Sequence, residues 1–390
     1  MKLANKMQYF SSSIFTEIAD YKNQLIAEGR DIIDLSIGSP DLPPPPHVRE
    51  AMLEAVANPG IYGYGDFYGS TLLRTAFADW FRNRFGGVQL NPQTEVTVLI
   101  GSQDGLAHLP ITLLDPGDLM LLPDPSYPAY YHGARLASAE IHWMPLLQEN
   151  DYLPDFSAIP EEVAREAKLM VLAQPGNPIP AIADERFFEE AIEFCRKHEI
   201  VLVHDLAYSE LCFGDYRPIS ILQIPGAKDV AVEFHSMSKS YSMAGARIGY
   251  CVGNPEIVGA LRSLKGNIDY GVFRAVQHAA TAALQGDQSY TREMSRVYEE
   301  RRDVLLDELA LLGWVIPKPK ATMFAWARLP VEMSSREFAF RLMDEAGVAT
   351  VPGEAFGVHG EGHVRIALVQ PTDRLREAAR RIAESGILNR

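Results

Sequence analysis

Four mostly apolar runs, each ending in small or polar residues, constrain the fold of this chain most. They are Val96–Ile100, Lys168–Ala173, Ile200–His204 and Val230–His235. Runs of this length predict strands buried within a sheet, and the segments between them carry helical patterns. This alternation is typical of an α/β domain with a mostly parallel sheet and helices on both faces. Ligands bind such sheets at the carboxyl ends of the strands, so we expect the four ends to meet at one crevice.

The last of these runs leads into the segment Ser236-Met-Ser238-Lys239-Ser-Tyr-Ser-Met-Ala-Gly-Ala-Arg247. A lysine amine forms a Schiff base with a carbonyl, and a second cation or a desolvated pocket favours its reactive, neutral form. Serine hydroxyls and an arginine fork suit a phosphate dianion. Pyridoxal 5′-phosphate (PLP) carries both groups and is the predicted cofactor. The alternative is an ordinary solvated loop, and the strand before the segment argues against it.

Polar residues follow the other three runs as well. Gly101-Ser102-Gln103 opens a predicted helix, whose first turn leaves amide groups free for an anion. Asn177 stands in a proline-fixed turn after the second run. Asp205 and Tyr208 follow the third. A carboxylate after a buried strand needs a partner, although Asp205 could instead cap a helix and Tyr208 could be a core aromatic residue.

The order of these motifs resembles class I/II aminotransferases of PLP fold type I. The matching segments are Gly101-Ser-Gln, Pro175-Gly-Asn-Pro, Asp205-x-x-Tyr208, Ser236-x-Ser-Lys239 with Arg247, and Val364-Arg365-Ile-Ala. The resemblance runs from Asp34 to the C-terminal helix, and within the family it points to the bacterial LL-diaminopimelate aminotransferase-like and PatA-like group. It implies a large PLP-binding domain, a smaller α/β C-terminal domain and transfer of an amino group from an L-amino acid to a 2-oxo acid, with 2-oxoglutarate as the expected acceptor and LL-diaminopimelate or a related amino acid as a possible donor.

The resemblance also implies a role for each matching residue at the reacting end of the cofactor. Lys239 would hold the cofactor and shuttle a proton at the substrate α-carbon. Asp205 would pair with the pyridine nitrogen, while Asn177 and Tyr208 would bind the phenolic oxygen. Arg365 would take the substrate carboxylate, with the backbone at Gly38 and the side chain of Asn177 nearby. Taken alone, Arg365 could equally be a surface residue of a strand.

The remaining implied contacts hold the ring and the phosphate. Tyr127 would stack on the ring. The implied phosphate ligands in this chain are Ser102, Gln103, Ser236, Ser238 and Arg247. Tyr64 matches the tyrosine that reaches the phosphate of the other subunit, which implies a homodimer with composite sites. Tyr62 and Tyr68 lie close enough in sequence to be the true counterpart.

The chain departs from the family pattern at two places. Where many relatives have Asn-Asn-Pro-Thr-Gly, it has Gly176-Asn-Pro-Ile-Pro180, which changes the turn after Asn177. Around Lys265–Gly271 there is no arginine of the kind that aspartate aminotransferases offer a distal carboxylate. A strict dicarboxylate specificity is therefore not expected.

The proline-rich segment Pro40–Pro46 predicts a rigid connection and suggests three parts. We expect an N-terminal arm and linker at 1–46 that packs on the small domain, and a large domain at 47–275. A linking helix from Tyr290 to Leu312 and a small C-terminal domain would follow within 276–390. Ser334 and Thr372 mark expected helix starts in that domain, and Gly386 marks an expected helix end.

The composition limits the kinds of partner and the cellular compartment that we expect. A formal net charge of −15 argues against nucleic acid and anionic membranes. The N-terminus has no charged segment followed by a long apolar stretch, so a cytoplasmic location is expected. The three cysteines and ten histidines show no metal-ligand spacing, so no metal is expected.

Two other functions remain open from the motifs alone. A PLP-dependent C–S β-lyase on the same fold would use the same lysine and aspartate. A non-catalytic sensor domain would need an added DNA-binding segment, and this chain shows no basic helix-turn-helix region. The motifs do not identify the amino donor.

Overall fold

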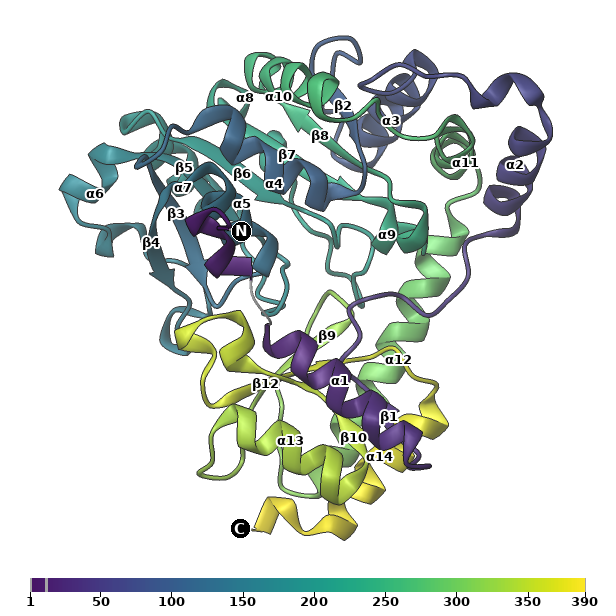
Figure 1. Ribbon diagram of the computed structural model, residues 1–390, viewed down its shortest axis with the longest axis vertical. Coiled ribbons are helices and arrows are strands. Elements are labelled where there is room, and N and C mark those ends of the chain that lie inside the picture. The colour runs from purple at the N-terminus through teal and green to yellow at the C-terminus, as the bar shows by residue number, and fades with distance from the viewer. Residues whose placement is uncertain (1, 11–12, 390) are drawn as a thin grey trace.

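A seven-stranded sheet forms the centre of the larger part of the molecule (Figure 1). The computed structural model describes residues 2–10 and 13–389, and within them the strand order of this sheet is β2-β8-β7-β6-β5-β3-β4. The strands are β2 (Val96–Leu99), β3 (Leu119–Asp124), β4 (Glu140–Pro145), β5 (Ala167–Leu172), β6 (Val201–Asp205), β7 (Ala231–Ser236) and β8 (Gly249–Gly253). Strand β8 runs antiparallel to β2 and β7, and the other neighbours are parallel. The predicted mostly parallel sheet is confirmed.

The four predicted strands are β2, β5, β6 and β7, with ends shifted by a single residue. Strand β7 is buried along its whole length, and β6 is buried after its first residue. Burial on both faces explains why these runs are mostly apolar rather than alternating. Their carboxyl ends lie at one edge of the sheet, because β2 and β7 are both antiparallel to β8.

Helices cover both faces of this sheet (Figure 1). On one face, α3 (Thr71–Arg84), α7 (Glu185–Lys197) and α11 (Arg274–Gln285) bury side chains in a common core with β5 and β6. On the other face, α4 (Ser102–Leu113), α5 (Pro128–Ala137) and α10 (Pro255–Ile268) do the same. The remaining helices of this part are α2 (Pro46–Ala57), α6 (Glu161–Glu166), α8 (Ala227–Val230) and α9 (Met237–Ser240).

A smaller body lies below the large sheet in Figure 1 and has its own apolar core. Its strands are β9 (Phe324–Arg328), β11 (Val351–Pro352) and β12 (His363–Ala367), which are antiparallel, and the parallel pair β1 (Ile33–Asp34) and β10 (Val348–Ala349). Its helices are α1 (Ile14–Ala27), α12 (Ser289–Leu311), α13 (Ser335–Ala346) and α14 (Thr372–Ser385). This body corresponds to the expected small α/β domain, and α12 leads into it from the large one.

The expected helix ends in the small body are confirmed. The Ser334 hydroxyl accepts a hydrogen bond from the Glu337 amide and caps α13. Helix α14 begins at Thr372 and is followed by Gly386 with φ 66°, a left-handed conformation that favours glycine.

Packing suggests one change to the expected domain ranges and one to the expected packing of the N-terminal arm. Helix α11 packs on α2 and α3. We therefore propose that the large domain extends to Gln285 rather than ending at residue 275. In the N-terminal arm, Ile18 and Leu25 of α1 pack in a cluster with Met343 of the small domain. The short helix η1 (Asn5–Phe10), in contrast, packs on α5 of the large domain.

Candidate active site

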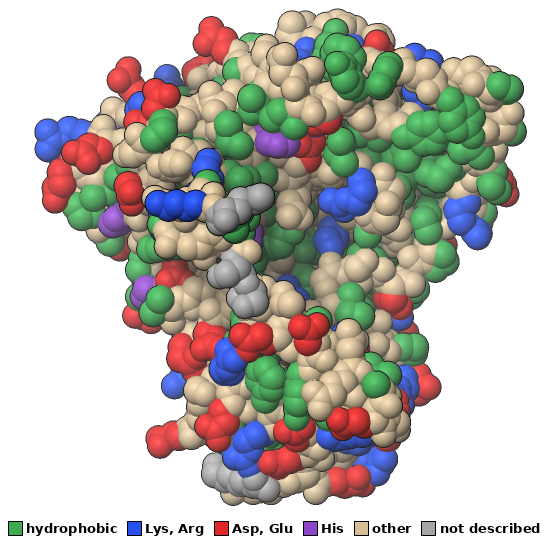
Figure 2. All heavy atoms as spheres, in the orientation of Figure 1, with side chains coloured by type: hydrophobic (Ala, Val, Ile, Leu, Met, Phe, Trp, Pro, Cys, Tyr) green, Lys and Arg blue, Asp and Glu red, His purple; other side chains and the backbone are tan. Residues whose placement is uncertain are grey.

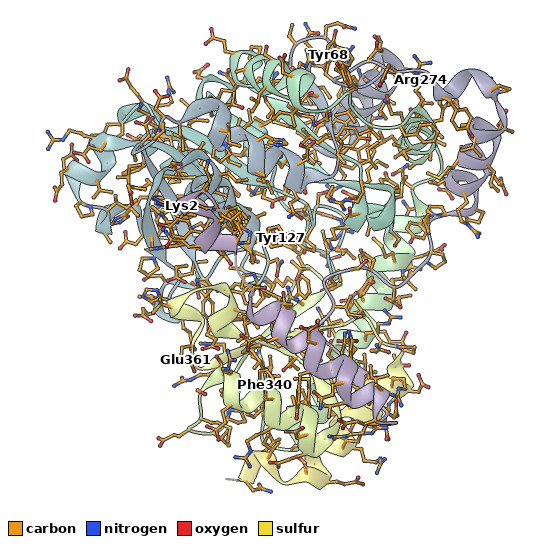
Figure 3. The ribbon with its side chains drawn as sticks, in the orientation of Figure 1. Lys2, Tyr68, Tyr127, Arg274, Phe340 and Glu361 are labelled. Atoms are coloured by element: carbon orange, nitrogen blue, oxygen red, sulfur yellow. The ribbon has the colours of Figure 1, made fainter. Side chains whose placement is uncertain are left out.

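A cavity of about 270 Å³ opens where the carboxyl ends of the central strands face the small domain. Most of the predicted site residues contribute to its lining. These are Gly38, Ser102, Tyr127, Asn177, Asp205, Tyr208, Ser236, Lys239 and Arg365. Figure 3 shows Tyr127 at the level where the two bodies meet. The crevice predicted from the strand ends is therefore present, and the small domain closes its other side through Arg365.

Lys239 lies in α9, directly after β7, so the strand end fixes its position. Its Nζ donates a hydrogen bond to the Gly38 carbonyl and lies 5.9 Å from the centre of the Tyr208 ring. Burial lowers the pKa of Lys239 to about 8, and the positive charges of Arg365 and Arg247 act in the same direction. A neutral amine, the form that attacks a carbonyl, is thus accessible near neutral pH.

Asp205 ends β6 and is 7% exposed. Its Oδ2 accepts a hydrogen bond of 2.8 Å from the Tyr130 hydroxyl, and its Oδ1 accepts one of 3.2 Å from the Ala207 amide. Burial raises the pKa of Asp205, and the Tyr130 hydrogen bond opposes that rise. Asp205 caps none of the helices between residues 13 and 389, so the helix-cap alternative is wrong.

Tyr208 satisfies both interpretations of its motif. It is 6% exposed and belongs to the apolar core of the small domain, where its ring lies 6.0 Å from that of Phe324. It also lines the cavity beside Lys239. Burial raises the pKa of Tyr208 strongly, so its hydroxyl stays protonated and can donate a hydrogen bond.

Sequence reasoning missed Tyr130. Pro128 starts α5 just after Tyr127, and the helix places Tyr130 on a face that turns toward Asp205. The Tyr127 and Tyr130 rings meet edge to face, with their centres 5.7 Å apart. The available signal was the three-residue spacing of the two tyrosines, which puts them on one side of a helix.

The start of α4 forms the opposite end of the cavity. Gly101 precedes α4 with φ 74°, and a side chain there would come within 2.5 Å of the Arg247 guanidinium. Arg247 donates from Nη1 to the Ala244 carbonyl at 3.0 Å. Ser236 and Ser238 are buried nearby on the β7–α9 segment. Free first-turn amides, two hydroxyls and a guanidinium together suit a phosphate group.

Gln103 and Tyr127 form a pair at the rim of this region. The Tyr127 hydroxyl donates to the Gln103 Oε1 at 3.2 Å. Tyr127 lines the cavity, whereas Gln103 sits behind it. Gln103 therefore reaches the cavity through Tyr127 in this structure, and its direct contact with a phosphate stays a prediction.

Arg365 is buried at 4% exposure on β12, so the surface-strand alternative is wrong. Its Nη1 donates to the Asn177 Oδ1 and its Nη2 to the Ser36 carbonyl, both at 2.8 Å. The Phe324 and Phe356 rings lie 4.2 and 5.0 Å from its guanidinium carbon. Burial lowers the pKa of Arg365 to about 10, so the side chain remains a cation at neutral pH.

The Nε of Arg365 is buried and has no hydrogen-bond partner among residues 2–10 and 13–389. A buried charged donor without a partner is costly unless a ligand supplies one. The group that suits a guanidinium in this position is a carboxylate, which pairs with it through two parallel hydrogen bonds.

The comparisons with known proteins agree with this geometry. The family described as Aminotransferase class I and II matches residues 30–382. The chain belongs to this family. It is 44% identical to an LL-diaminopimelate aminotransferase of Syntrophobacter fumaroxidans, with 97% of each chain covered. A substrate-bound BacF structure from Bacillus subtilis has a TM-score of 0.95 at 40% identity and 98% coverage of both chains. A probable N-succinyldiaminopimelate aminotransferase from Thermus thermophilus has a TM-score of 0.90 at 42% identity, covering 96% of this chain and all of the other.

This aminotransferase is therefore a PLP-dependent enzyme that acts on amino acid and 2-oxo acid substrates. The residues in the cavity fit the cofactor. Lys239 offers an amine with a lowered pKa, Asp205 a buried carboxylate, and the start of α4 a phosphate-sized cradle closed by Arg247. A methyl group at Gly101 would fill part of that cradle, which shows how closely the backbone and guanidinium approach each other.

A buried ionic network in the aminotransferase lies behind these residues, and the sequence motifs did not indicate it. Glu233 is 0% exposed and bonds to His204 Nδ1 at 3.0 Å and to His235 Nε2 at 2.7 Å. Ser220 donates to the same carboxylate at 2.8 Å. His204 and His235 immediately precede Asp205 and Ser236, so the network ties together the ends of the two central strands. The only signal in the sequence was polar residues within apolar runs.

Tyr64 lies outside the cavity of this aminotransferase chain. It is 79% exposed, its carbonyl accepts a hydrogen bond from Arg274 Nη2 at 2.5 Å, and its ring lies 4.9 Å from that of Tyr270. Tyr62 and Tyr68 are 65% and 40% exposed. Figure 3 places Tyr68 and Arg274 high in the large domain, well away from Tyr127. Tyr64 therefore does not line the cavity that Lys239 and Asp205 form in its own chain.

The described residues contain neither a membrane-spanning helix nor a metal-binding cluster. Between residues 2 and 10 and between 13 and 389, no helix is long and apolar enough to cross a membrane. The same residues contain no group of three or more His, Cys, Asp or Glu side chains arranged to hold a metal ion. All three cysteines are buried and unpaired.

Proposed function

We propose that this aminotransferase takes LL-diaminopimelate, or an amino acid closely related to it, as amino donor and 2-oxoglutarate as acceptor. The relative from Syntrophobacter fumaroxidans, named for that donor and 44% identical over 97% of the chain, carries the proposal. The names of the relatives favour transamination over the β-lyase and sensor functions. The cavity supports PLP chemistry on an amino acid, which transamination and β-elimination share, because it presents an amine, a carboxylate and a guanidinium to one small volume.

Lys239 has two tasks in the proposed reaction. It holds the cofactor through its amine before substrate arrives, and it then moves a proton to or from the substrate α-carbon. When bound, the cofactor supplies an aldehyde that accepts the amino group and a ring that takes up electrons from the α-carbon. The lowered pKa of Lys239 supports both tasks, because each requires the neutral amine.

Asp205 and its neighbours control the charge of the bound ring. Asp205 holds a proton on the pyridine nitrogen, and Tyr130 fixes the carboxylate through its 2.8 Å hydrogen bond. Asn177 and Tyr208 donate to the phenolic oxygen. The Asn177 Oδ1 accepts from Arg365, which fixes the orientation of the amide, and the amide nitrogen is the donor that can reach the phenolic oxygen.

Arg365 binds the α-carboxylate of the substrate, with the Gly38 backbone close by. The Gly38 carbonyl accepts from Lys239, and a side chain at Gly38 would lie 4.0 Å from Arg365 Nη2. Arg365 belongs to the small domain, while Asn177 and Lys239 belong to the large one. A substrate held between them favours closure of the two domains.

The phosphate and ring contacts complete the proposed site. Tyr127 lines the cavity and would stack on the ring. The groups that hold the phosphate are the Arg247 guanidinium, the Ser236 and Ser238 hydroxyls and the backbone amides at Ser102 and Gln103.

We propose that the active form is a homodimer in which Tyr64 contacts the phosphate bound by the partner subunit. The support is a set of exposed aromatic and apolar side chains. They are Leu53, Tyr62, Tyr64, Tyr270 and Phe273, which are 68%, 65%, 79%, 57% and 44% exposed. Hydrophobic side chains gather on the large domain over α2 and α11 in Figure 2, to the right in that view. An apolar surface of this kind marks an association site.

A cytoplasmic location also stays a prediction. Its support is compositional, because three cysteines that are buried and unpaired suit a reducing compartment. The net charge of −15 suits an enzyme of small molecules better than a protein that binds nucleic acid.

A donor screen with the purified holoenzyme tests the proposed function. LL-diaminopimelate, glutamate, aspartate, alanine and phenylalanine are each offered with 2-oxoglutarate, and then with pyruvate, as acceptor. We expect kcat/KM for LL-diaminopimelate with 2-oxoglutarate to exceed that of the other donors by at least about tenfold, which is about 1.4 kcal/mol of transition-state binding. A higher value for another donor overturns the donor assignment. Release of pyruvate and ammonia from cystathionine, without amino transfer, overturns the reaction assignment in favour of the β-lyase.

A further inference from the structure

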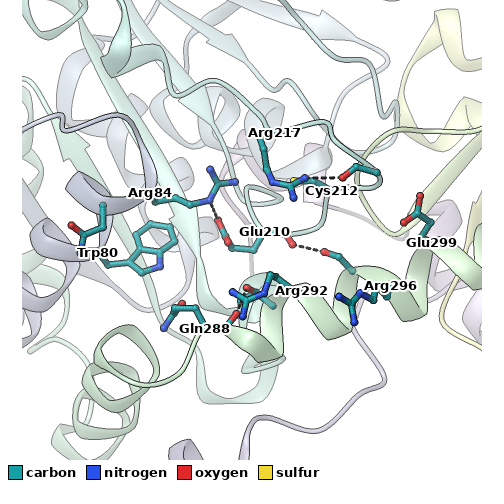
Figure 4. A pocket seen from close by; sticks show the side chains of 13 residues that line it. Trp80, Arg84, Glu210, Cys212, Arg217, Gln288, Arg292, Arg296 and Glu299 are labelled. Atoms are coloured by element: carbon teal, nitrogen blue, oxygen red, sulfur yellow. Dashed lines mark hydrogen bonds and ion pairs between the residues drawn. The ribbon is translucent and has the colours of Figure 1, made fainter.

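A second cavity, of about 580 Å³, lies away from the active site between α3, α12 and the loop after β6 (Figure 4). Trp80 and Arg84 come from α3, Glu210 and Arg217 from the loop, and Arg292 from α12. A hollow of this size accommodates a small organic molecule. None of the catalytic roles proposed above uses any of these residues.

Arginines dominate the charge of this cavity, although the whole chain is strongly acidic with a net charge of −15. Arg84, Arg217, Arg292 and Arg296 contribute to the lining, against the two carboxylates of Glu210 and Glu299. In Figure 4, Arg217 enters from the side of the loop, and Arg292 and Arg296 enter from α12.

Both carboxylates pair with arginines, and the arginine beside Glu299 also pairs with Asp303 at 2.8 Å. Glu210 pairs with Arg84 Nε at 2.8 Å, and Glu299 pairs with Arg302 Nη2 at 3.3 Å. Arg217, Arg292 and Arg296, in contrast, form no salt bridge with the described residues 2–10 and 13–389.

Hydrogen bonds to two nearby backbone carbonyls orient the Arg217 side chain. Its Nη1 donates to the Gly214 and Tyr216 carbonyls at 2.9 and 2.6 Å, which leaves the other guanidinium donors unused by protein carboxylates. Three guanidinium groups around one hollow therefore retain donors for an anion. An arginine fork binds carboxylate and phosphate groups through paired hydrogen bonds.

The walls of the cavity are continuous with segments that carry the active site. Ser295 of α12 donates at 2.7 Å to the carbonyl of Glu210, which lies five positions after Asp205 in the sequence. Arg84 donates to the Ser209 carbonyl at 3.0 Å. Gln288, at the start of α12, accepts at 2.6 Å from the hydroxyl of Tyr241, which lies two positions after Lys239. A ligand held here would contact the outer side of both segments.

We propose that this cavity binds a small metabolite with two or more carboxylate or phosphate groups, held by Arg217, Arg292 and Arg296. The indole of Trp80 supplies an apolar wall for the carbon skeleton of the ligand. The arginines come from two sides of the hollow, so a molecule with at least two anionic groups suits them better than a monocarboxylate such as acetate.

Calorimetric titration of the holoenzyme tests this proposal without any measurement of activity. Citrate and pyrophosphate are the probes, because they separate carboxylate from phosphate recognition, and acetate is the negative control at matched ionic strength. The titrations use Arg365→Gln protein as well as the unmodified chain, because the active-site arginine could itself bind citrate. We expect one molecule of citrate or pyrophosphate per chain in both proteins, and no binding of acetate.

The deciding variant is Arg292→Gln/Arg296→Gln, in which both side chains are exposed and removal leaves the core intact. We expect its affinity for the probe to fall at least about tenfold. The matched control, Arg49→Gln/Arg186→Gln, removes two exposed arginines from α2 and α7 and should change affinity less than about twofold.

Hydrogen exchange locates the bound probe. Slower exchange in residues 206–217 and 288–299 supports the cavity. Equal affinity in both double variants, or no binding by either probe, overturns the proposal.

Discussion

At the scale of single residues, burial sets the ionisation of the groups that meet in the active site. It lowers the pKa of Lys239 to about 8 and that of Arg365 to about 10, and it raises the pKa of Asp205. Each shift makes the charged form less favourable. In the proposed site, the cofactor and the substrate carboxylate would carry charges opposite to those of Lys239, Arg365 and Asp205 and would favour their charged forms.

The pKa of Lys239 makes the pH dependence of cofactor capture a test of its role. In protein freed of cofactor, we expect the rate of covalent attachment to rise with pH through a midpoint near 8 rather than 10.5, because only the neutral amine reacts. Stopped-flow absorbance after adding PLP measures this rate. Lys239→Ala should show no attachment and no adduct after borohydride reduction, whereas Lys168→Ala, at an exposed lysine, should behave like the parent. A midpoint above about pH 10 would contradict the assigned environment.

The hydrogen bond from Tyr130 to Asp205 yields a second prediction. Tyr130→Phe leaves a buried carboxylate oxygen without its donor, so we expect kcat to fall about 10- to 100-fold, as for a loss of about 1–3 kcal/mol. Because that hydrogen bond opposes the rise in the pKa of Asp205, its loss should move the acidic limb of the kcat/KM profile to higher pH. Steady-state kinetics across pH check both effects. Tyr131→Phe is the control, and an unchanged profile in Tyr130→Phe would exclude the positioning role.

At the scale of elements, the site groups lie where strands end and helices begin. Asp205 ends β6, Ser236 ends β7, and α4 begins right after Gly101. The rigid sheet fixes these three points relative to one another. Strand β7 runs directly into α9, and only Ile100 and Gly101 separate β2 from α4, so the proposed cofactor contacts at these two points depend on backbone geometry as much as on side-chain identity.

The close approach of Gly101 and Arg247 can be tested against a matched glycine. Gly101→Ala places a methyl group 2.5 Å from the Arg247 guanidinium, so we expect PLP to bind at least about tenfold more weakly. Gly117→Ala imposes a similar positive φ, 92° against 74°, but meets no atom within 4 Å. Both variants should lose about 1 kcal/mol of stability from backbone strain. Fluorescence titration with PLP separates them, and equal affinities would mean that Arg247 does not hold the phosphate.

The buried network at Glu233 predicts a pH-dependent stability. Burial by itself would raise the pKa of Glu233, but hydrogen bonds from His204 and His235 outweigh it and lower the pKa from 4.5 to about 2. The resulting stability is fully present above pH 4.5 and is lost as the pH falls toward 2.

We expect Glu233→Gln to lower the free energy of unfolding by about 3 kcal/mol at about pH 7. At about pH 3 the difference in unfolding free energy between variant and parent should be smaller by about 2 kcal/mol. Urea unfolding at both pH values measures this difference. Glu95→Gln removes a less buried carboxylate paired with Lys228 and should cost no more than about 1 kcal/mol. A gap for Glu233→Gln that is the same at both pH values would refute the assigned ionisation.

Sequence patterns predicted four strands of the central sheet, β2, β5, β6 and β7, to within a residue, because a strand buried on both faces is a continuous apolar run; β3, β4 and β8 were not predicted. They also indicated Asp205, Lys239 and Arg365, whose chemistry is uncommon at such positions. Tyr130 and Glu233 were missed, since a tyrosine and a glutamate within an element have many ordinary roles. The feature that distinguishes each of them is a partner distant in the sequence, and a single sequence read by itself holds no record of that pairing.

At the scale of the whole molecule, the proposed homodimer predicts complementation between two inactive variants. Lys239→Ala and a variant with the loop around Tyr64 removed are each expected to be inactive as homodimers. In a mixed dimer both lesions fall in one site and leave the other intact, so activity should recover to about half per mixed dimer. Co-expression with two affinity tags isolates the mixed species for assay. Mixed dimers without activity, or a fully active monomer in sedimentation, would contradict the composite site.

The pairing of β1 with β10 joins residues 33–34 to residues 348–349. During translation the N-terminal segment therefore leaves the ribosome long before its partner strand exists. At about 5–20 residues per second, the delay lasts tens of seconds. Ile18, Leu25 and Ile33 of that segment, all buried in the finished protein, stay exposed to solvent or to chaperones over this interval. The large domain, which is contiguous in sequence, can fold before the N-terminal segment pairs with β10.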